Sequence, residues 1–384
     1  MHIQELRIHG FRSLRDITWQ PGKLNVLIGP NGSGKSNLLR ALELLHRATK
    51  GGLAEEILQQ GGFGSLMWDR QTNQLSWSIR TGYGDDAYAY QLSLRGFAAP
   101  NQYRVEIERL TEGAVTLLER QGNEAYIVIN DNMTQDVPSK FPEDQSLLSK
   151  VDYLGLMNNL SNFGILNFRT SLIEWEIYHE LQVHQGTTLR QAPVARLEDK
   201  IATDGQNLIP VLHTLYSGNR EFKKTVDQSM RAAFGSDYEE LVFPPAADQR
   251  IQLRIRWKSL KTEQSAADLS DGTLRFLLLV AILANPEPGS LIAIDEPETG
   301  LHPSMFPIIA ELAAEAAERT QVVLTTHSPQ FLDAFKDEPP TTTVAQWDQG
   351  ETRLSIVDGE ELRRWLQEYS LGALFRSGEL EALA

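Results

Sequence analysis

The stretch LNVLIGPNGSGKS, residues 24–36, decides how the rest of the chain is interpreted. Its first five residues are almost entirely apolar, which predicts a short buried strand. Gly29, Gly32 and Gly34 follow at once and let the backbone turn sharply, so that several N–H groups point into one space. Leucines then recur at helical spacing over residues 36–48, so the loop opens a helix. A curled backbone at a helix N-terminus is an anion-binding site.

The same loop matches the Walker A pattern G-x-x-x-x-G-K-[ST] of phosphate-binding loops. We expect Lys35 to reach the β- and γ-phosphates of ATP and Ser36 to bind Mg²⁺. The predicted nucleotide site comprises Asn31, Gly32, Ser33, Gly34, Lys35, Ser36 and Asn37. The alternative is a glycine-rich turn that matches by chance, and the strand before it and the helix after it argue against that alternative.

An acidic segment, LIAIDEPE at residues 291–298, ends a second predicted buried strand. A carboxylate at the end of such a strand loses hydration, and a cation lying opposite would compensate this cost. We therefore predict that Asp295 binds Mg²⁺ and that Glu296 acts as the general base toward the attacking water. The alternative is an ordinary solvated acidic loop. The presence of a phosphate-binding loop in the same chain argues against that alternative.

A third segment, LSDGT at residues 269–273, precedes this strand and opens a helix. Taken alone it is only a helix cap, because Ser270 is a favourable N-cap residue and Gly272 permits a close backbone approach. In this order and spacing it resembles the signature motif LSGGQ of ABC proteins. The resemblance implies that Ser270, Asp271 and Gly272 contact the γ-phosphate held by a second protomer. Asp271 departs from the usual first glycine and Thr273 from the usual glutamine.

Three shorter segments extend the resemblance. The wording DEPETGLHP, residues 295–303, resembles ATPases of the OLD and RecF type more than transporter subunits, which usually read DEPTSALD. His327, at the end of a predicted buried strand, resembles the switch histidine that senses the γ-phosphate. The segment FRS at residues 11–13 resembles one in which an arginine, here Arg12, approaches the nucleotide. The alternative for Arg12 is an exposed arginine in a hairpin.

The chain therefore resembles the SMC/RecF/OLD branch of ABC-type P-loop ATPases. The resemblance implies ATP and Mg²⁺ as cofactors, hydrolysis of ATP to ADP and phosphate, and an ATP-dependent homodimer. It also implies a glutamine that contacts the metal. Gln145 is our candidate, because it follows the predicted strands and precedes a helical stretch, and Gln91 and Gln102 compete with it.

The order of predicted elements indicates an α/β fold: a P-loop NTPase core, the ABC ATPase head, interrupted by two insertions. Short strands separated by turns over residues 74–130 predict an antiparallel meander. Apolar residues at helical spacing predict a mostly helical stretch from about 146 to 235, and residues 359–369 read as a terminal helix. The predicted units are the first core half (1–70), the β insertion (71–145), the helical lobe (146–249) and the second core half (250–384).

Composition limits the partners. The net charge is −15, which disfavours non-specific DNA binding over the whole surface. Alternation over residues 250–258 places four basic residues on one strand face: Arg250, Arg254, Arg256 and Lys258. This face is a candidate for DNA contact, and the alternative is the solvated side of an ordinary strand. The chain has no cysteine, which rules out disulfides and thiolate metal sites.

No apolar run is long enough to cross a membrane and the first residues do not read as a signal peptide, so we expect a cytoplasmic protein. The sequence contains no long heptad run of an SMC arm, and the segment after His327 is too short for the TOPRIM nuclease domain of OLD proteins. We predict an ATP-driven dimer acting in DNA repair, DNA maintenance or anti-phage defence, with a partner effector such as a nuclease or toxin. The alternatives are a transporter's ATP-binding subunit and a nucleotide-dependent binding module with negligible turnover.

Overall fold

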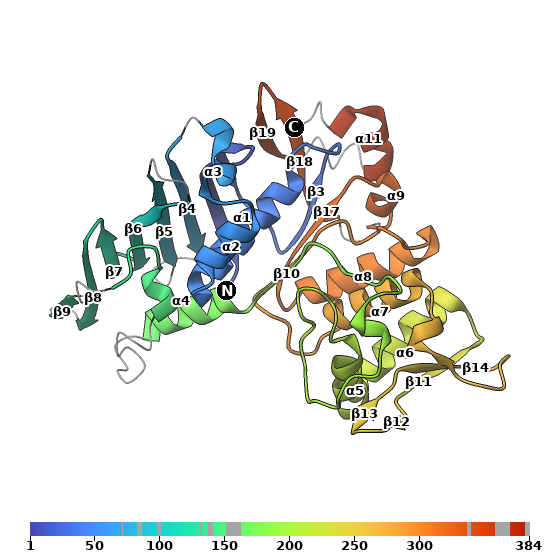
Figure 1. Cartoon of the computed structure of the whole chain (residues 1–384). Helices are drawn as coiled ribbons and strands as arrows, with labels where there is room; N and C mark the ends of the chain where they lie inside the picture. The colour runs from blue at the N-terminus through green and yellow to red at the C-terminus, as the bar shows by residue number, and fades with distance from the viewer. Residues whose placement is uncertain are drawn as a thin grey trace.

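Two large β-sheets, two small ones and the helices around them form the described part of the protein (Figure 1). The computed structural model describes residues 1–70, 72–82, 87–97, 101–130, 133–136, 141–150, 163–335, 339–357 and 369–380. Within these ranges, no helix combines the length and apolarity needed to cross a bilayer.

The central sheet is mainly parallel. Its strands lie in the order β10 (Trp175–Tyr178), β16 (Leu291–Ile294), β17 (Gln321–Thr326), β3 (Leu24–Ile28), β18 (Thr341–Asp348) and β19 (Glu351–Val357). Only the last pair, β18 and β19, is antiparallel. Alternate residues of the parallel strands enter two different cores, as Val26 and its neighbour Leu27 do. Burial on both faces explains the continuous apolar runs from which the sequence predicted these strands.

The second sheet is antiparallel and packs on one side of the central sheet (Figure 1). Its strands, in spatial order, are β2 (Leu14–Trp19), β1 (Ile3–Phe11), β4 (Gln74–Thr81), β5 (Tyr88–Gly96), β6 (Tyr103–Glu112), β7 (Val115–Gln121), β8 (Glu124–Asn130) and β9 (Met133–Asp136). The predicted meander is therefore confirmed. The structure adds the β1–β2 hairpin to it, through pairing of β1 with β4.

The helices divide between the two faces of the central sheet. On the side of the antiparallel sheet lie α1 (Lys35–Lys50), α2 (Leu53–Gln59), α3 (Phe63–Leu66), α4 (Phe163–Ile173) and the 3-10 turns η1 (Trp68–Arg70) and η3 (Leu147–Lys150). The other core contains α5 (Leu208–Gly218), α6 (Arg220–Phe234), α7 (Asp271–Leu283), α8 (Phe306–Ala317), α9 (Pro329–Leu332) and α11 (Leu371–Ser377). Three 3-10 turns join them: η6 (Thr188–Arg190), η7 (Ala266–Asp268) and η8 (Pro303–Met305).

Two small sheets complete the part of the molecule that contains this second core. One contains β11 (Tyr238–Val242), β14 (Arg254–Trp257) and β15 (Gln264–Ser265), and the other pairs β12 (Pro245–Ala246) with β13 (Arg250–Ile251). The strand predicted over 250–258 is therefore wrong as one continuous element. Residues 252 and 253 separate two short strands that belong to different sheets, so alternation does not run through the whole segment.

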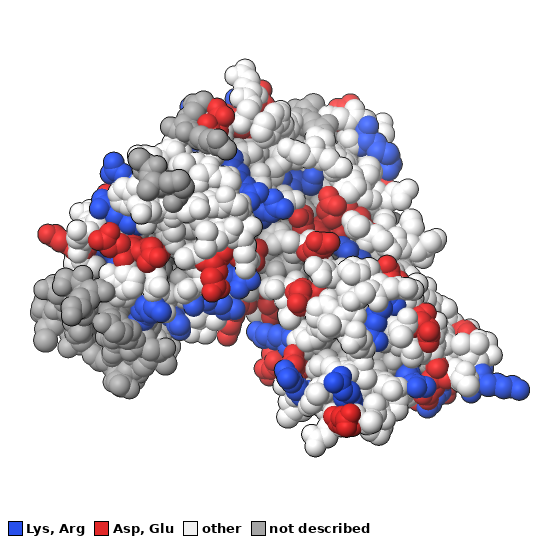
Figure 2. Space-filling view, viewed as in Figure 1, with Lys and Arg blue, Asp and Glu red and all other residues white. Residues whose placement is uncertain are grey.

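The four basic residues of that segment are engaged within the chain. Arg256 pairs with Glu240 and with Glu263, the second at 2.8 Å. Arg250 and Lys258 donate to the carbonyls of residues 192 and 236, and Arg254 donates to the side chain of residue 252. On the face viewed in Figure 2, acidic and basic side chains of the described residues are interspersed. The expected continuous basic face is not formed.

Two further expectations need correction. The stretch predicted as mostly helical contains β10, which joins the central sheet, and no α-helix forms over residues 179–207. β10 has only four residues, one of them Glu176, and so short a segment cannot be assigned to strand or helix by periodicity alone, which explains the miss. Strands β18 and β19 were not predicted from the sequence. The predicted helix 359–369 lies outside the described residues apart from Tyr369.

A buried carboxylate ties the antiparallel sheet to the segment that leads back toward the central sheet. Glu108 on β6 has no exposed surface. It accepts hydrogen bonds from the Tyr90 hydroxyl (2.9 Å), the Ser146 hydroxyl (2.7 Å) and the backbone N–H groups of Leu147 (2.7 Å) and Leu148 (3.3 Å). All four partners donate, so the site requires a group that only accepts.

We predict that Glu108→Gln destabilises the protein by about 2 kcal/mol although it preserves the shape, because an amide NH₂ would face donors. Urea denaturation followed by circular dichroism measures the change. Glu106→Gln is the matched control, since Glu106 also lies on β6 but pairs with Arg104 near the surface. Equal stabilities of the two variants would contradict the role assigned to Glu108.

Candidate nucleotide-binding site

The site lies where four parallel strands end at one edge of the central sheet. The phosphate-binding loop follows β3, His327 follows β17, Asp295 follows β16 and His179 follows β10. Neighbouring parallel strands in register end side by side, so these residues meet although the chain separates them widely. This edge of an open α/β sheet is the usual place for a ligand.

Glycines shape the loop between β3 and α1. Gly32 and Gly34 have positive φ angles of 83° and 99°. A Cβ atom on Gly34 would lie 2.0 Å from Oγ1 of Thr352, so no larger residue fits there. The loop borders a cavity of about 320 Å³. Its lining comprises Asn31, Gly32, Gly34, Lys35, Ser36, Asn37 and Glu296. Ser33, also predicted for the site, is buried instead, and its carbonyl accepts from Thr352.

Lys35 begins α1 with its side chain folded over the loop. Its ammonium group donates to the carbonyls of Gly29 at 2.8 Å and Pro30 at 3.1 Å. Burial lowers the pKa of Lys35, and the negative charges of Glu296, Asp295 and Glu298 oppose this effect. The lysine charge therefore lies between the glycine loop and the acidic segment across from it.

Asp295 carries the oxygen atoms suited to a metal. Burial acts to raise its pKa, but the nearby His179 imidazole and the hydroxyls of Thr325 and Ser36 outweigh this and lower it. The carboxylate and the Ser36 hydroxyl come together, and hard oxygen donors of this kind fit Mg²⁺, which typically takes one or two protein ligands and completes its shell with phosphate and water oxygens. The structure therefore places the two predicted ligands side by side.

His179 is a site residue that the sequence did not reveal. Its Nε2 lies 2.7 Å from Oε2 of Glu43 on α1, and its Nδ1 lies 4.0 Å from Oδ2 of Asp295. Burial acts to lower the pKa of His179, but these two carboxylates raise it to about 9. A signal was present for Glu43, which lies seven residues after Ser36 and so two turns along the same helix face. His179 gave none, because β10 was not recognised.

Glu296 holds an unusual backbone conformation, with φ of 45°. Its N–H donates to Oγ1 of Thr325 at 3.1 Å, while the same hydroxyl donates to Asp295. Nδ1 of His327 lies 3.0 Å from Oε1 of Glu296. A non-glycine residue at positive φ stores strain that surrounding contacts must hold. The candidate base and the candidate switch histidine are thus in direct contact beside the cavity.

Arg275, one turn into α7, is a second residue not anticipated from sequence. Its Nη2 donates to the carbonyl of Glu296 at 3.1 Å. Burial lowers the pKa of Arg275, against the charges of Glu298, Glu180 and Glu296. Glu298 itself is buried and accepts from the Thr326 hydroxyl, and burial raises its pKa. The helix that carries the signature segment therefore touches the candidate catalytic loop directly.

Gln145 does not lie at the metal site, so this prediction is wrong. Its carbonyl accepts from Arg120 at 2.8 Å, and the η3 turn that follows it meets the far end of α1, where a Cβ atom on Gly51 would lie 3.6 Å from Cβ of Ser149. That end is about 22 Å along the helix from Ser36. The position beside Asp295 belongs to His179.

Arg12 lies beside the phosphate-binding loop and not in its cavity. It adopts a positive φ of 48° in the β1–β2 turn and donates to Oε1 of Gln60 at 3.1 Å. It lines a neighbouring cavity of about 520 Å³ with Trp68 and Trp347. Ser13, the next residue, accepts from the side chain of Asn37 at 2.8 Å and so connects this turn to the loop helix.

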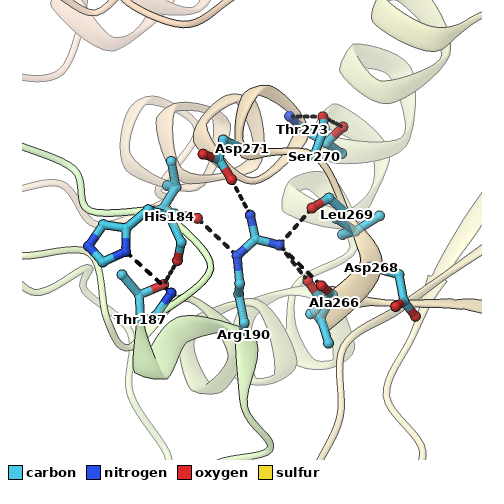
Figure 3. A network of polar contacts seen from close by, with 12 residues as sticks. His184, Thr187, Arg190, Ala266, Asp268, Leu269, Ser270, Asp271 and Thr273 are labelled. Atoms are coloured by element: carbon cyan, nitrogen blue, oxygen red, sulfur yellow. Dashed lines mark hydrogen bonds and ion pairs between the residues drawn. The ribbon is translucent and has the colours of Figure 1, made fainter.

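The signature segment forms the exposed N-terminus of α7. Oγ of Ser270 accepts from the N–H of Thr273 at 3.1 Å, which is an N-cap bond (Figure 3). A Cβ atom on Gly272 would lie 2.9 Å from the carbonyl of Gly300, so the helix tip and the loop after Glu296 approach closely. Ser270 and Asp271 are exposed, and neither lines the cavity of its own chain.

Comparisons with known proteins agree with this geometry. A family model described as AAA domain, putative AbiEii toxin, Type IV TA system matches residues 24–333. The OLD nuclease of Thermus scotoductus is 24% identical, covering 88% of this chain and 61% of the nuclease. An ATP/GTP phosphatase of Helicobacter pylori is 23% identical and covers 86% of each chain. The chain thus spans less than two thirds of the length of the nuclease.

The fold is similar to a solved SMC head, the one crystallised with the C-winged helix domain of ScpA. The two structures superpose with a TM-score of 0.57 at 14% identity, covering 95% of this chain and 100% of that chain. The predicted fold class, a P-loop NTPase with added β and helical parts, is confirmed. The chain belongs to the AAA domain family whose model it matches, and it is a P-loop ATPase of the SMC/RecF/OLD type.

Proposed function

We propose that this ATPase works as a nucleotide-driven clamp, in which two copies enclose two Mg·ATP molecules. Each nucleotide would bind the phosphate-binding loop of one copy and the Ser270 helix tip of the other. The observation that carries the proposal is the separation of the two parts. The tip is exposed and capped, yet it lies outside the lining of its own chain's cavity.

The cavity supplies the groups that a triphosphate requires. Backbone N–H groups at the start of α1 and the Lys35 ammonium bind phosphate oxygens, and the helix dipole adds to the attraction. Ser36 and Asp295 would hold Mg²⁺, which when bound supplies positive charge beside the terminal phosphates. His179 and Thr325 orient the Asp295 carboxylate, and Thr325 also fixes the backbone of Glu296.

Hydrolysis would use Glu296 as general base. Its carboxylate lines the cavity and lies 3.0 Å from His327. The carboxylate orients a water toward the γ-phosphate and accepts its proton, while His327 donates a hydrogen bond toward the phosphate or the base. Loss of the γ-phosphate removes the group shared by two copies, and the clamp opens.

The output of the clamp would pass to a separate effector. The family description refers to a putative toxin of a toxin–antitoxin system, and the related SMC head is bound to a domain of another protein. We propose that the nucleotide state of this chain controls such a partner in DNA maintenance or anti-phage defence. DNA contact by the 250–258 segment forms no part of the proposal, since its cations are engaged internally.

Lys35→Ala should weaken ATP binding about tenfold or more, because a charge-assisted hydrogen bond to phosphate is lost. Calorimetric titration with a non-hydrolysable ATP analogue measures the affinity. Lys50→Ala, at the other end of α1, is the matched control and should bind as the unmodified chain does. Unchanged affinity in Lys35→Ala would reject the loop as the phosphate site.

Glu296→Gln should retain ATP binding and lose turnover about a hundredfold or more, since the amide cannot take the proton. The trapped nucleotide should also hold two copies together, so sedimentation velocity in MgATP should show a dimer. Glu315→Gln, an exposed change on α8, provides the control. Phosphate release by Glu296→Gln at the rate of the unmodified chain would exclude Glu296 as the general base.

His179→Ala should raise the Mg²⁺ concentration needed for tight ATP binding about tenfold, because Asp295 loses an orienting partner. ATP affinity measured over a Mg²⁺ titration reports this shift, and affinity without Mg²⁺ should stay the same. His9→Ala, an exposed change on β1, should behave as the unmodified chain. A parallel loss of affinity with and without Mg²⁺ would point to a general structural defect instead.

A further inference from the structure

A buried arginine from a distant part of the chain holds the signature segment in place. Arg190, in the η6 turn, is only 7% exposed. Its guanidinium donates to the carbonyl of Leu269 at 2.6 Å and to those of Ala266 and Ala267 at 3.3 Å each. Its Nη2 donates to the carboxylate of Asp271 (Figure 3). One side chain therefore contacts three residues of the segment that leads into α7 and also Asp271, the first residue of the helix.

The arginine is itself fixed from behind. Its Nε donates to the carbonyl of Val183 at 3.0 Å. The turn just before η6 is closed by the hydroxyl and the N–H of Thr187, which both donate to the carbonyl of His184. Figure 3 shows this turn on one side of Arg190 and the signature segment on the other. A planar guanidinium with its hydrogen bonds distributed in this way has little freedom to move.

Asp271 creates an electrostatic problem that Arg190 solves. Its side chain is 57% exposed and stands beside Ser270, at the helix tip. In the proposed clamp, this tip meets the γ-phosphate held by the other copy. A lone carboxylate there would repel the triphosphate, since like charges at close range disfavour association. Pairing with Arg190 cancels that charge. Because the arginine is buried, its guanidinium stays beside Asp271 and does not turn out into solvent.

We propose that Arg190 is a positioning residue for the trans half of the ATP site, which neutralises Asp271 and fixes the path of residues 266–271. The inference rests on the proposed clamp and goes beyond it, because it names the group that makes this variant signature compatible with phosphate. Arg190 touches neither nucleotide nor the reacting atoms. It acts through Asp271 and through the backbone carbonyl of Leu269.

The test uses the Glu296→Gln background, in which MgATP should hold the dimer. Arg190→Gln should raise the ATP concentration for half-maximal dimerisation about tenfold or more, since it leaves Asp271 unpaired and the segment loose. Adding Asp271→Asn to Arg190→Gln should recover most of this loss, because the repelling charge is gone. Sedimentation velocity measures dimerisation, and calorimetry measures ATP binding to the single copy, which should stay constant.

Rescue by Asp271→Asn separates charge neutralisation from a general role in folding, which a second substitution would not repair. If Arg190→Gln does not fold, Arg190→Lys replaces it: the ammonium keeps the charge but cannot reach Leu269 and Asp271 together, so an intermediate loss is expected. Unchanged dimerisation of the folded Arg190 variant, or a double variant no better than the single one, overturns this inference alone. Absence of the dimer in Glu296→Gln itself overturns the clamp, and the inference with it.

Discussion

The parallel register of four strands is the constraint on which the rest of this structure depends. β3, β17, β16 and β10 pair in order, with Ile28 opposite Thr326 and Ile294 opposite both Leu324 and Tyr178. These four strands therefore end at the same edge of the sheet. The glycine loop, His327 and the acidic segment converge there because their strands do. A shift of one residue in any pairing would turn buried side chains to the wrong face and move the end of that strand relative to its neighbours.

Helix α7, which the signature segment opens, is held by arginine hydrogen bonds at two places. Arg190 donates to the carbonyl of Leu269, just before the helix. Arg275, in the second turn of the helix, donates to the carbonyl of Glu296. Gly272 and Gly300 approach so closely that no side chain fits between them. The helix whose tip is proposed to meet the partner's phosphate is thus in direct contact with Glu296, the candidate base of its own site.

The sequence predicted individual elements well and their sheet membership less well. Strands β3, β16 and β17 were recognised because a strand that is buried on both faces has a nearly continuous apolar sequence. β10 is just as buried, but four residues are too few to distinguish a strand from a helical segment by period. The pairing of the β1–β2 hairpin with β4 spans about seventy residues, and no local pattern records it. Strands β18 and β19 were missed altogether.

The sequence by itself determined the chemistry that short contiguous motifs carry. These are the glycine loop with Lys35 and Ser36, the Asp295–Glu296 pair and the capped tip at Ser270, since in each the residues that act together are neighbours in the chain. Tertiary structure alone decided which side chains complete them: His179 beside Asp295, Arg275 on Glu296 and Arg190 on Asp271. Such contacts join residues far apart along the chain, and their energy depends on burial and distance, which a linear order does not contain. For the same reason the choice of Gln145 failed, because order along the chain suggested a place that the folded chain gives to His179.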